Sequence, residues 1–268
     1  MKQMEHKIDT LHYDDLANRD HSSVFDENET YDMLIVRLPE IKEMHELDIV
    51  SYGFVITEET SYFFNPLSSA LEELSERFDG PYRIIDRKVD KVLAEFQAYE
   101  DEILKLEESL YSEKRQNNFI GGWLNLKRDI VRIERVMLRT VTILNEMVSH
   151  YEKEEGFPVN HYLDLHEHCE RLYRSATLQL AKLDYLYNFY NTRTNEKMNR
   201  LIFLLTIISA IFLPLNLLVG FFGMNTSGLP FTAAEEGTMK VVWFMGFVAV
   251  LTLLIVMLWR KKIEETEA

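Results

Sequence analysis

A few polar side chains interrupt a long apolar stretch in the last third of the sequence. Between Leu201 and Phe222 no residue is charged, and roughly 20 apolar residues at about 1.5 Å each span the hydrocarbon core of a bilayer. The polar exceptions within this stretch are Thr206, Ser209 and Asn216. An amide that faces lipid loses its hydrogen bonds, so we expect Asn216 to face protein or water. Side chains of this kind can contact a passing hydrated cation.

The spacing of these residues places them on one face of a helix. Positions seven residues apart lie almost above one another along a helix. One such row contains Ser209, Asn216 and Gly223, and the adjacent row contains Asn199, Thr206, Leu213 and Gly220. A polar stripe on an apolar helix predicts a pore formed by several copies of the chain. The alternative is a plain membrane anchor, in which an occasional Ser or Thr bonds to its own backbone.

A second group of residues could hold a metal ion outside the apolar stretch. Asp164 and Glu167 are three residues apart, so they share a helix face, and carboxylate oxygens suit Mg²⁺. The alternative is that these acids only compensate the dipole at the start of a helix. Four neighbouring residues, His161, His166, His168 and Cys169, have side chains that suit Zn²⁺. Histidines scattered along a polar helix are also common without any metal.

The sequence contains a second apolar run, so the chain is expected to form two membrane helices. The second apolar run, Val241–Trp259, is followed by a basic tail, and basic residues also precede the first run. The connecting segment carries only Lys240 as a basic residue. The positive-inside rule therefore predicts a multi-pass protein of the cell inner membrane, with both termini in the cytoplasm and the connecting loop outside.

Composition excludes several other classes of function. The formal net charge of −15 argues against a general nucleic-acid-binding surface. The single cysteine, Cys169, excludes an intrachain disulfide and fits a reducing compartment. Residues 1–20 lack the apolar core of a signal peptide. Because the sequence contains neither a phosphate-binding Gly-x-x-x-x-Gly-Lys loop nor a paired catalytic constellation, we expect no enzyme activity and no cofactor.

The N-terminal part predicts a small α/β domain over residues 1–80. Three β-branched and aromatic runs, Tyr31–Leu38, Asp48–Thr57 and Ser61–Asn65, predict an antiparallel sheet. The capping-box spacing of Ser69 and Glu72 predicts a short helix over residues 70–78. Residues 1–30 show no strong element.

The rest of the chain predicts long helices. They are expected over residues 82–111 and 122–153, and the third should begin near Val159 and continue into the membrane because no Gly or Pro occurs between Asn160 and Leu213. The fold class is therefore an α+β membrane protein. Its expected parts are the N-terminal domain, a helical bundle and stalk (81–200), a first transmembrane helix (201–222), an outer loop (223–240), a second transmembrane helix (241–259) and a tail (260–268).

The residues that close the first apolar stretch resemble a known family signature. Gly223-Met224-Asn225 stands at the end of the first of two spans, as in the CorA family of divalent-cation channels and transporters. Leu205-Thr-Ile-Ile208 and Ile211-Phe-Leu-Pro-Leu215 resemble that family's pore helix at the same spacing. The run His161–His168 is similar to its Tyr-x-x-Asp-x-x-Asp-His element. The resemblance covers roughly residues 30–262.

The resemblance implies a role for each candidate residue. The protein would be a homopentamer whose first span lines the pore, with Gly223, Met224 and Asn225 as the selectivity filter. Mg²⁺ keeps several of its waters, and a ring of Asn225 amide oxygens can accept hydrogen bonds from them. Deeper polar stations would be Asn199, Thr206, Ser209 and Asn216, and Ile202, Leu205 and Leu213 would be hydrophobic gates. Asp164 and Glu167 would form a regulatory metal site at subunit interfaces.

The sequence departs from the family pattern in ways that leave the conducted ion open. Phe222 stands where Tyr is usual, and Asn216 where Thr is usual. The loop Thr226–Phe231 resembles the Gly-x-Pro type of the zinc-transporting ZntB branch rather than the acidic type of magnesium channels. From the resemblance to the CorA family as a whole, we expect a channel for Mg²⁺, with Co²⁺ or Ni²⁺ as further cations. The alternatives are a ZntB-like proton-coupled Zn²⁺ transporter and a membrane scaffold that does not conduct.

Overall fold

The computed structural model describes residues 8–41, 46–111, 119–224 and 237–266. The chain forms two compact units, residues 1–188 and 189–268, which are described separately below. One helix, α5 (Val159–Phe222), contributes to both units.

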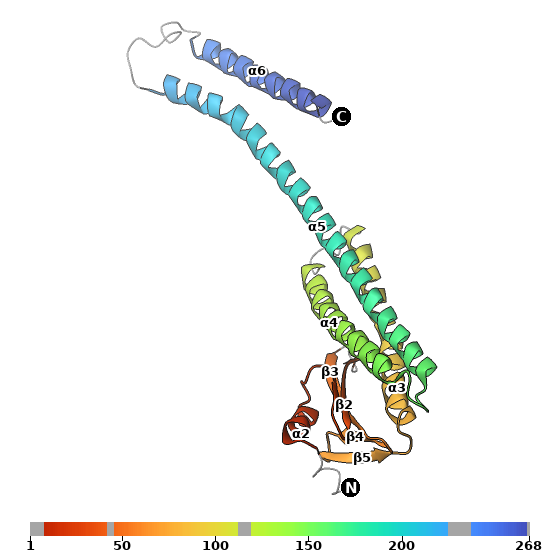
Figure 1. Cartoon of the computed structure of the whole chain (residues 1–268). Helices are drawn as coiled ribbons and strands as arrows, with labels where there is room; N and C mark the ends of the chain where they lie inside the picture. The colour runs from red at the N-terminus through yellow and green to blue at the C-terminus, as the bar shows by residue number, and fades with distance from the viewer. Residues whose placement is uncertain (1–7, 42–45, 112–118, 225–236, 267–268) are drawn as a thin grey trace. The chain divides into compact units, whose positions relative to one another are not determined.

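The first unit begins with an antiparallel sheet (Figure 1). The strands follow one another in the order of the chain, each pairing with the next: β1 (Val24–Glu27), β2 (Asp32–Ile41), β3 (Leu47–Ile56), β4 (Ser61–Asn65) and β5 (Ala70–Leu74). Most of β2 is buried on both faces, since helix α2 (Thr10–Ala17) contributes Leu16 to a cluster on one side and long helices pack against the other. Gly53 permits this packing, because a Cβ atom there would lie 2.5 Å from Leu16 Cδ2. The predicted antiparallel sheet is confirmed.

Three long helices make up the rest of the first unit: α3 (Asp79–Tyr111), α4 (Phe119–Tyr151) and the first part of α5. Buried residues on α3 alternate steps of three and four, from Ile85 through Val89, Val92 and Phe96 to Tyr99. This spacing forms the apolar seam of packed helices. Where the seams meet, Trp123 Nε1 of α4 donates to the Leu183 carbonyl of α5 at 2.9 Å.

Two local predictions for the N-terminal part are wrong. Residues 70–74 form strand β5 instead of a helix, because pairing with β4 outweighs the capping-box spacing. The hairpin between β4 and β5 holds Ser69 at a φ of 50°, and Asn65 Nδ2 donates to Glu72 at 2.6 Å across it. The first 30 residues also contain regular structure, since α2 and β1 lie there. Asp9 accepts a hydrogen bond from the Leu11 N–H at 2.8 Å and so caps the start of α2.

The second unit consists of the C-terminal part of α5 and helix α6 (Gly237–Thr266). The helix predicted to begin near Val159 and continue into the apolar stretch is confirmed, because α5 is continuous to Phe222. Pro214 lies inside α5, where it lacks an N–H and leaves the Ala210 carbonyl without its helical donor. The predicted fold class, an α+β membrane protein, is confirmed.

Candidate functional site

The most apolar segments of α5 and α6 are not buried by the rest of the described chain. Both helices are long and apolar enough to cross a membrane, and the most apolar segment of each is 0% buried. The three predicted gate residues show this directly: Ile202, Leu205 and Leu213 are 56%, 64% and 67% exposed. Apolar surface on this scale needs lipid or another copy of the chain to cover it.

The polar residues of this stretch lie on an unbroken helix. Because α5 is helical from Val159 to Phe222, positions seven apart share one face, so Asn199, Thr206, Ser209 and Asn216 follow the rows that their spacing predicts. The Thr206 hydroxyl donates to the Ile202 carbonyl at 2.8 Å, which leaves its oxygen free to accept a further hydrogen bond.

The first two residues of the predicted filter lie just after α5 ends. The Gly223 N–H donates to the Val219 carbonyl at 2.8 Å, and the Met224 N–H donates to the Phe221 carbonyl at 3.4 Å. A Cβ atom on Gly223 would lie 2.9 Å from the Val219 oxygen, so this position has no room for a side chain unless the backbone shifts. Asn225 and the loop residues 226–236 lie outside the described residues.

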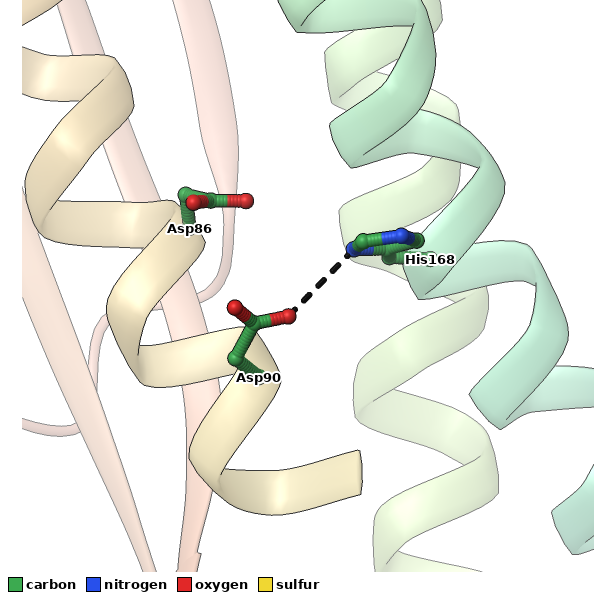
Figure 2. A group of neighbouring side chains, drawn as sticks. All are labelled: Asp86, Asp90 and His168. Carbon is green, nitrogen blue, oxygen red and sulfur yellow. Dashed lines mark ion pairs between the residues drawn. The ribbon is translucent and has the colours of Figure 1, made fainter. Parts of the chain in front are cut away.

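A cluster of two aspartates and one histidine joins α3 to α5 in the first unit (Figure 2). Asp86 and Asp90 are one turn apart on α3, and His168 comes from α5. Each offers one ligand atom, and these atoms lie within 4.8 Å of one another. Nδ1 of His168 is 3.4 Å from Asp90 Oδ1. Burial raises the pKa of the Asp86 carboxyl group, and the negative charge of Asp90 raises it further.

This cluster was only partly predictable from sequence. His168 belongs to the predicted group of zinc-suited residues, but its neighbours in the structure are aspartates of another helix. Cys169 is fully buried, and burial raises the pKa of its thiol well above the ordinary value. His161 stacks on Tyr82 and lies 3.3 Å from Asp79. The sequence signal for Asp86 and Asp90 is their spacing of four, which places both on one face of α3.

The two predicted regulatory acids have different neighbours within one chain. Asp164 Oδ1 is 3.8 Å from Nε2 of His168, so it borders the cluster. Glu167 instead lines a pocket on α5 with Arg171, Arg174, Ser175 and Leu178. Their pairing across a subunit interface stays a prediction, because the structure describes a single chain.

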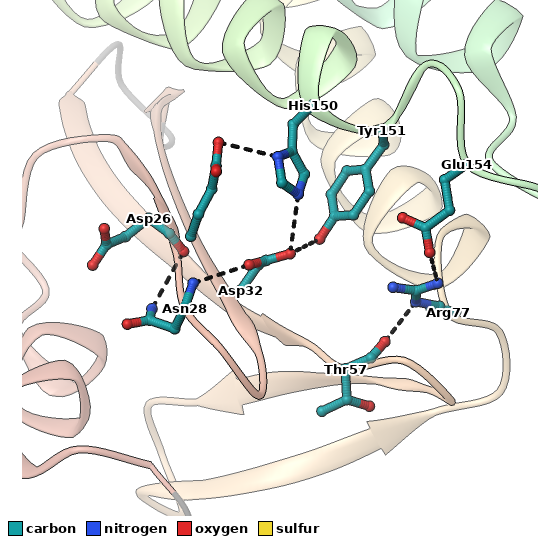
Figure 3. A network of polar contacts seen from close by, with 9 residues as sticks. Asp26, Asn28, Asp32, Thr57, Arg77, His150, Tyr151 and Glu154 are labelled. Atoms are coloured by element: carbon teal, nitrogen blue, oxygen red, sulfur yellow. Dashed lines mark hydrogen bonds and ion pairs between the residues drawn. The ribbon is translucent and has the colours of Figure 1, made fainter.

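A second polar network connects the sheet to the end of α4 (Figure 3). His150 lies 3.1 Å from Glu27 Oε1 and 3.6 Å from Asp32 Oδ2, and the Tyr151 hydroxyl donates to the Asp32 carboxylate. Arg77 pairs with Glu154 and donates to the Thr57 carbonyl at 2.5 Å. These groups bind one another and fasten the hairpin of β1 and β2 to the helices, so the network supports the fold.

Comparison with known proteins identifies the family. The family model described as a CorA-like Mg²⁺ transporter protein matches residues 2–261. The chain belongs to the CorA family. This confirms the resemblance that Gly223-Met224-Asn225 and its flanking residues indicated.

Individual CorA relatives agree with this assignment at low sequence identity. The cobalt/magnesium transport protein CorA of Thermotoga maritima is 24% identical over 78% of this chain and 64% of its own length. The zinc transport protein ZntB of Vibrio parahaemolyticus is 23% identical over 66% of this chain and 50% of its own length. The chain thus spans about half to two thirds of the length of these curated relatives.

A solved CorA structure shows the same fold. The CorA magnesium transporter from Methanocaldococcus jannaschii superposes with a TM-score of 0.75, covering 95% of this chain and 84% of that chain at 17% identity. At this identity the likeness speaks for the fold alone. The small antiparallel sheet, the long helices and the apolar C-terminal helix are therefore shared features of the CorA architecture.

Proposed function

We propose that the chain is a divalent-cation channel of the CorA type that conducts Mg²⁺, with Co²⁺ or Ni²⁺ as further cations. The observation that carries this proposal is helix α5. It runs unbroken from Val159 to Phe222, and its apolar part carries Thr206, Ser209 and Asn216 on two adjacent heptad rows and no charge. A helix that only anchored the chain would need no such rows.

The proposed pore is a homopentamer lined by α5. The exposed apolar faces at Ile202, Leu205 and Leu213 support assembly, since copies of the helix and lipid would cover them. In such a ring Asn199, Thr206, Ser209 and Asn216 supply hydrogen-bonding oxygens along the pore, while the three apolar residues form constrictions that close by dewetting. In this proposal the chain spans the cell inner membrane twice, and both termini lie in the cytoplasm.

The proposed filter is the ring of Gly223, Met224 and Asn225 at the outer mouth. Mg²⁺ dehydrates reluctantly, so amide oxygens that accept hydrogen bonds from its waters suit it better than a tight dry cage. The driving force is the membrane potential, which favours entry of a divalent ion by about 4.6 kcal/mol per 100 mV. The named substrates of the Thermotoga relative, cobalt and magnesium, support the same cations here.

Replacing Asn225 by alanine is expected to abolish the preference for Mg²⁺ over Ca²⁺ and Na⁺ while leaving assembly intact. The change removes the amide oxygens that would receive the hydrated ion. Competition flux in reconstituted liposomes, with oligomer size checked by chromatography, measures this. Asn160→Ala, which truncates an exposed asparagine at the start of α5, is the matched control. Unchanged selectivity in the Asn225→Ala channel would contradict the filter.

A ZntB-like proton-coupled Zn²⁺ transporter is the second candidate. Two observations favour it: the relative from Vibrio parahaemolyticus is a zinc transport protein, and the loop after Asn225 has a Gly-x-Pro sequence. It predicts that Zn²⁺ uptake depends on a pH gradient, which a potential-driven Mg²⁺ channel does not require.

A further inference from the structure

The cluster of Asp86, Asp90 and His168 has the donor set of a transition-metal site. It combines one imidazole nitrogen with two carboxylate oxygens, contributed by two helices that pack together inside one chain. We infer that these three residues bind a transition-metal dication, with Zn²⁺ as the best fit, within a single protomer. The inference concerns binding and does not depend on which ion the pore conducts.

The distances in the cluster suit an ion of this size. Zinc bonds to nitrogen and oxygen are about 2.0–2.2 Å long, so neighbouring ligand atoms in a tetrahedral site are about 3.4 Å apart. Nδ1 of His168 and Oδ1 of Asp90 are 3.4 Å apart, and all three ligand atoms lie within 4.8 Å of one another. Because Asp86 and Asp90 are side chains on the surface of one helix, a change of rotamer can bring both to the ion.

The surroundings of the His168 ring provide a second and independent argument. Its Nδ1 atom is buried and makes no hydrogen bond with any described residue, although it points at the Asp90 carboxylate. Its other nitrogen, Nε2, lies 3.8 Å from Asp164 Oδ1. A histidine that binds a metal through one nitrogen commonly directs the other at a carboxylate, which orients the ring. Asp164 is therefore a positioning residue of this site.

Electrostatics and ligand type together select the cation. In the metal-free chain the negative charges of Asp86 and Asp90 repel each other, and a dication between them would remove that repulsion. An imidazole ligand favours Zn²⁺, Co²⁺ or Ni²⁺ over Mg²⁺, which prefers oxygen ligands and retains its water. Three protein ligands leave a fourth position for water.

Zinc titration of the full-length chain in detergent tests the site. Isothermal calorimetry should show a Zn²⁺ site, with Mg²⁺ in excess failing to displace the ion. His168→Asn is expected to lose this site, weakening binding by more than about 100-fold, and Asp164→Asn should weaken it by about 10–100-fold. His166→Asn, on the same helix and outside the cluster, is the matched control and should bind as the parent does. With Co²⁺ as the probe, the parent should show a visible absorption band that His168→Asn lacks.

A second variant separates loss of the site from loss of the fold. Asp86 and Asp90 are carboxylates one turn apart on α3, so in the metal-free chain their like charges repel each other. Asp86→Asn should therefore match or exceed the parent's melting temperature at pH 7 without metal, yet gain nothing from added Zn²⁺. The inference is overturned if Zn²⁺ binds His168→Asn or Asp86→Asn as tightly as the parent, or if Mg²⁺ displaces Zn²⁺ readily.

Discussion

Replacing Gly223 by alanine is expected to reduce divalent-cation flux by at least about tenfold, the effect of roughly 1.4 kcal/mol on a barrier. The reason is steric. A Cβ atom would lie 2.9 Å from the Val219 carbonyl oxygen, closer than real Cβ atoms approach, and the obstructing atom is backbone. The last turn of α5 must then shift, and the hydrogen bond from Gly223 N–H to that oxygen must change with it. Met224 would move with it, out of register in the proposed filter.

The measurement is Mg²⁺ uptake into liposomes that hold an inside-negative potential. Gly246→Ala is the matched control, because a Cβ atom at Gly246 in α6 meets no atom of the described residues within 4 Å. Both variants must form the same oligomer as the parent, measured by chromatography. A Gly223→Ala protein that conducts as well as the Gly246→Ala protein would show that the end of α5 tolerates displacement and that the proposed filter is not there.

Truncation of Tyr162 to alanine is expected to lower the free energy of unfolding of the first unit by about 3–5 kcal/mol. Tyr162 is 0% exposed at the start of α5. Its ring stacks on Phe157 with centroids 4.9 Å apart and lies 5.8 Å from the ring of Tyr82. Its hydroxyl donates to the Phe78 carbonyl at 2.8 Å. Removing the ring leaves a cavity between the start of α5, the start of α3 and Phe157.

Tyr162→Phe separates the ring from the hydroxyl. It keeps the aromatic packing and leaves the Phe78 carbonyl without its donor, so it should cost only about 1–2 kcal/mol. Urea unfolding followed by circular dichroism measures both variants. An alanine variant as stable as the phenylalanine variant would mean that the aromatic cluster around Tyr162 contributes little to holding α5 in place.

The main architecture could be predicted because its determinants are local. α5 lacks Gly and Pro from Asn160 to Leu213, so helix propagation meets no obstacle over that length. β-branched and aromatic runs likewise predict strands wherever pairing partners follow directly along the chain, as in β2 and β3. Gly223-Met224-Asn225 indicated the family because the motif stands at the end of an apolar span. That position is more specific evidence than the three residue types alone.

The parts that could not be predicted depend on distant contacts. β5 forms because β4 pairs with it, although Ser69 and Glu72 locally favour a helix start. The metal-competent cluster requires α3 to pack against α5, which brings His168 to Asp86 and Asp90 across about eighty positions of sequence. Periodicity identifies the apolar seams of these helices but does not specify the rotation at which two seams meet. Asn225 lies outside the described residues, so its role in the filter stays a proposal.

Ion flux through the purified chain in liposomes tests the central claim most directly. Mg²⁺ and Zn²⁺ are offered separately, each under an inside-negative potential, with and without a pH gradient. The account predicts Mg²⁺ uptake that follows the membrane potential and is unchanged when the pH gradient is removed. Absence of flux for both ions in a correctly assembled oligomer would contradict transport altogether. Uptake of Zn²⁺ alone, and only with a pH gradient, would contradict the magnesium channel and favour the zinc transporter.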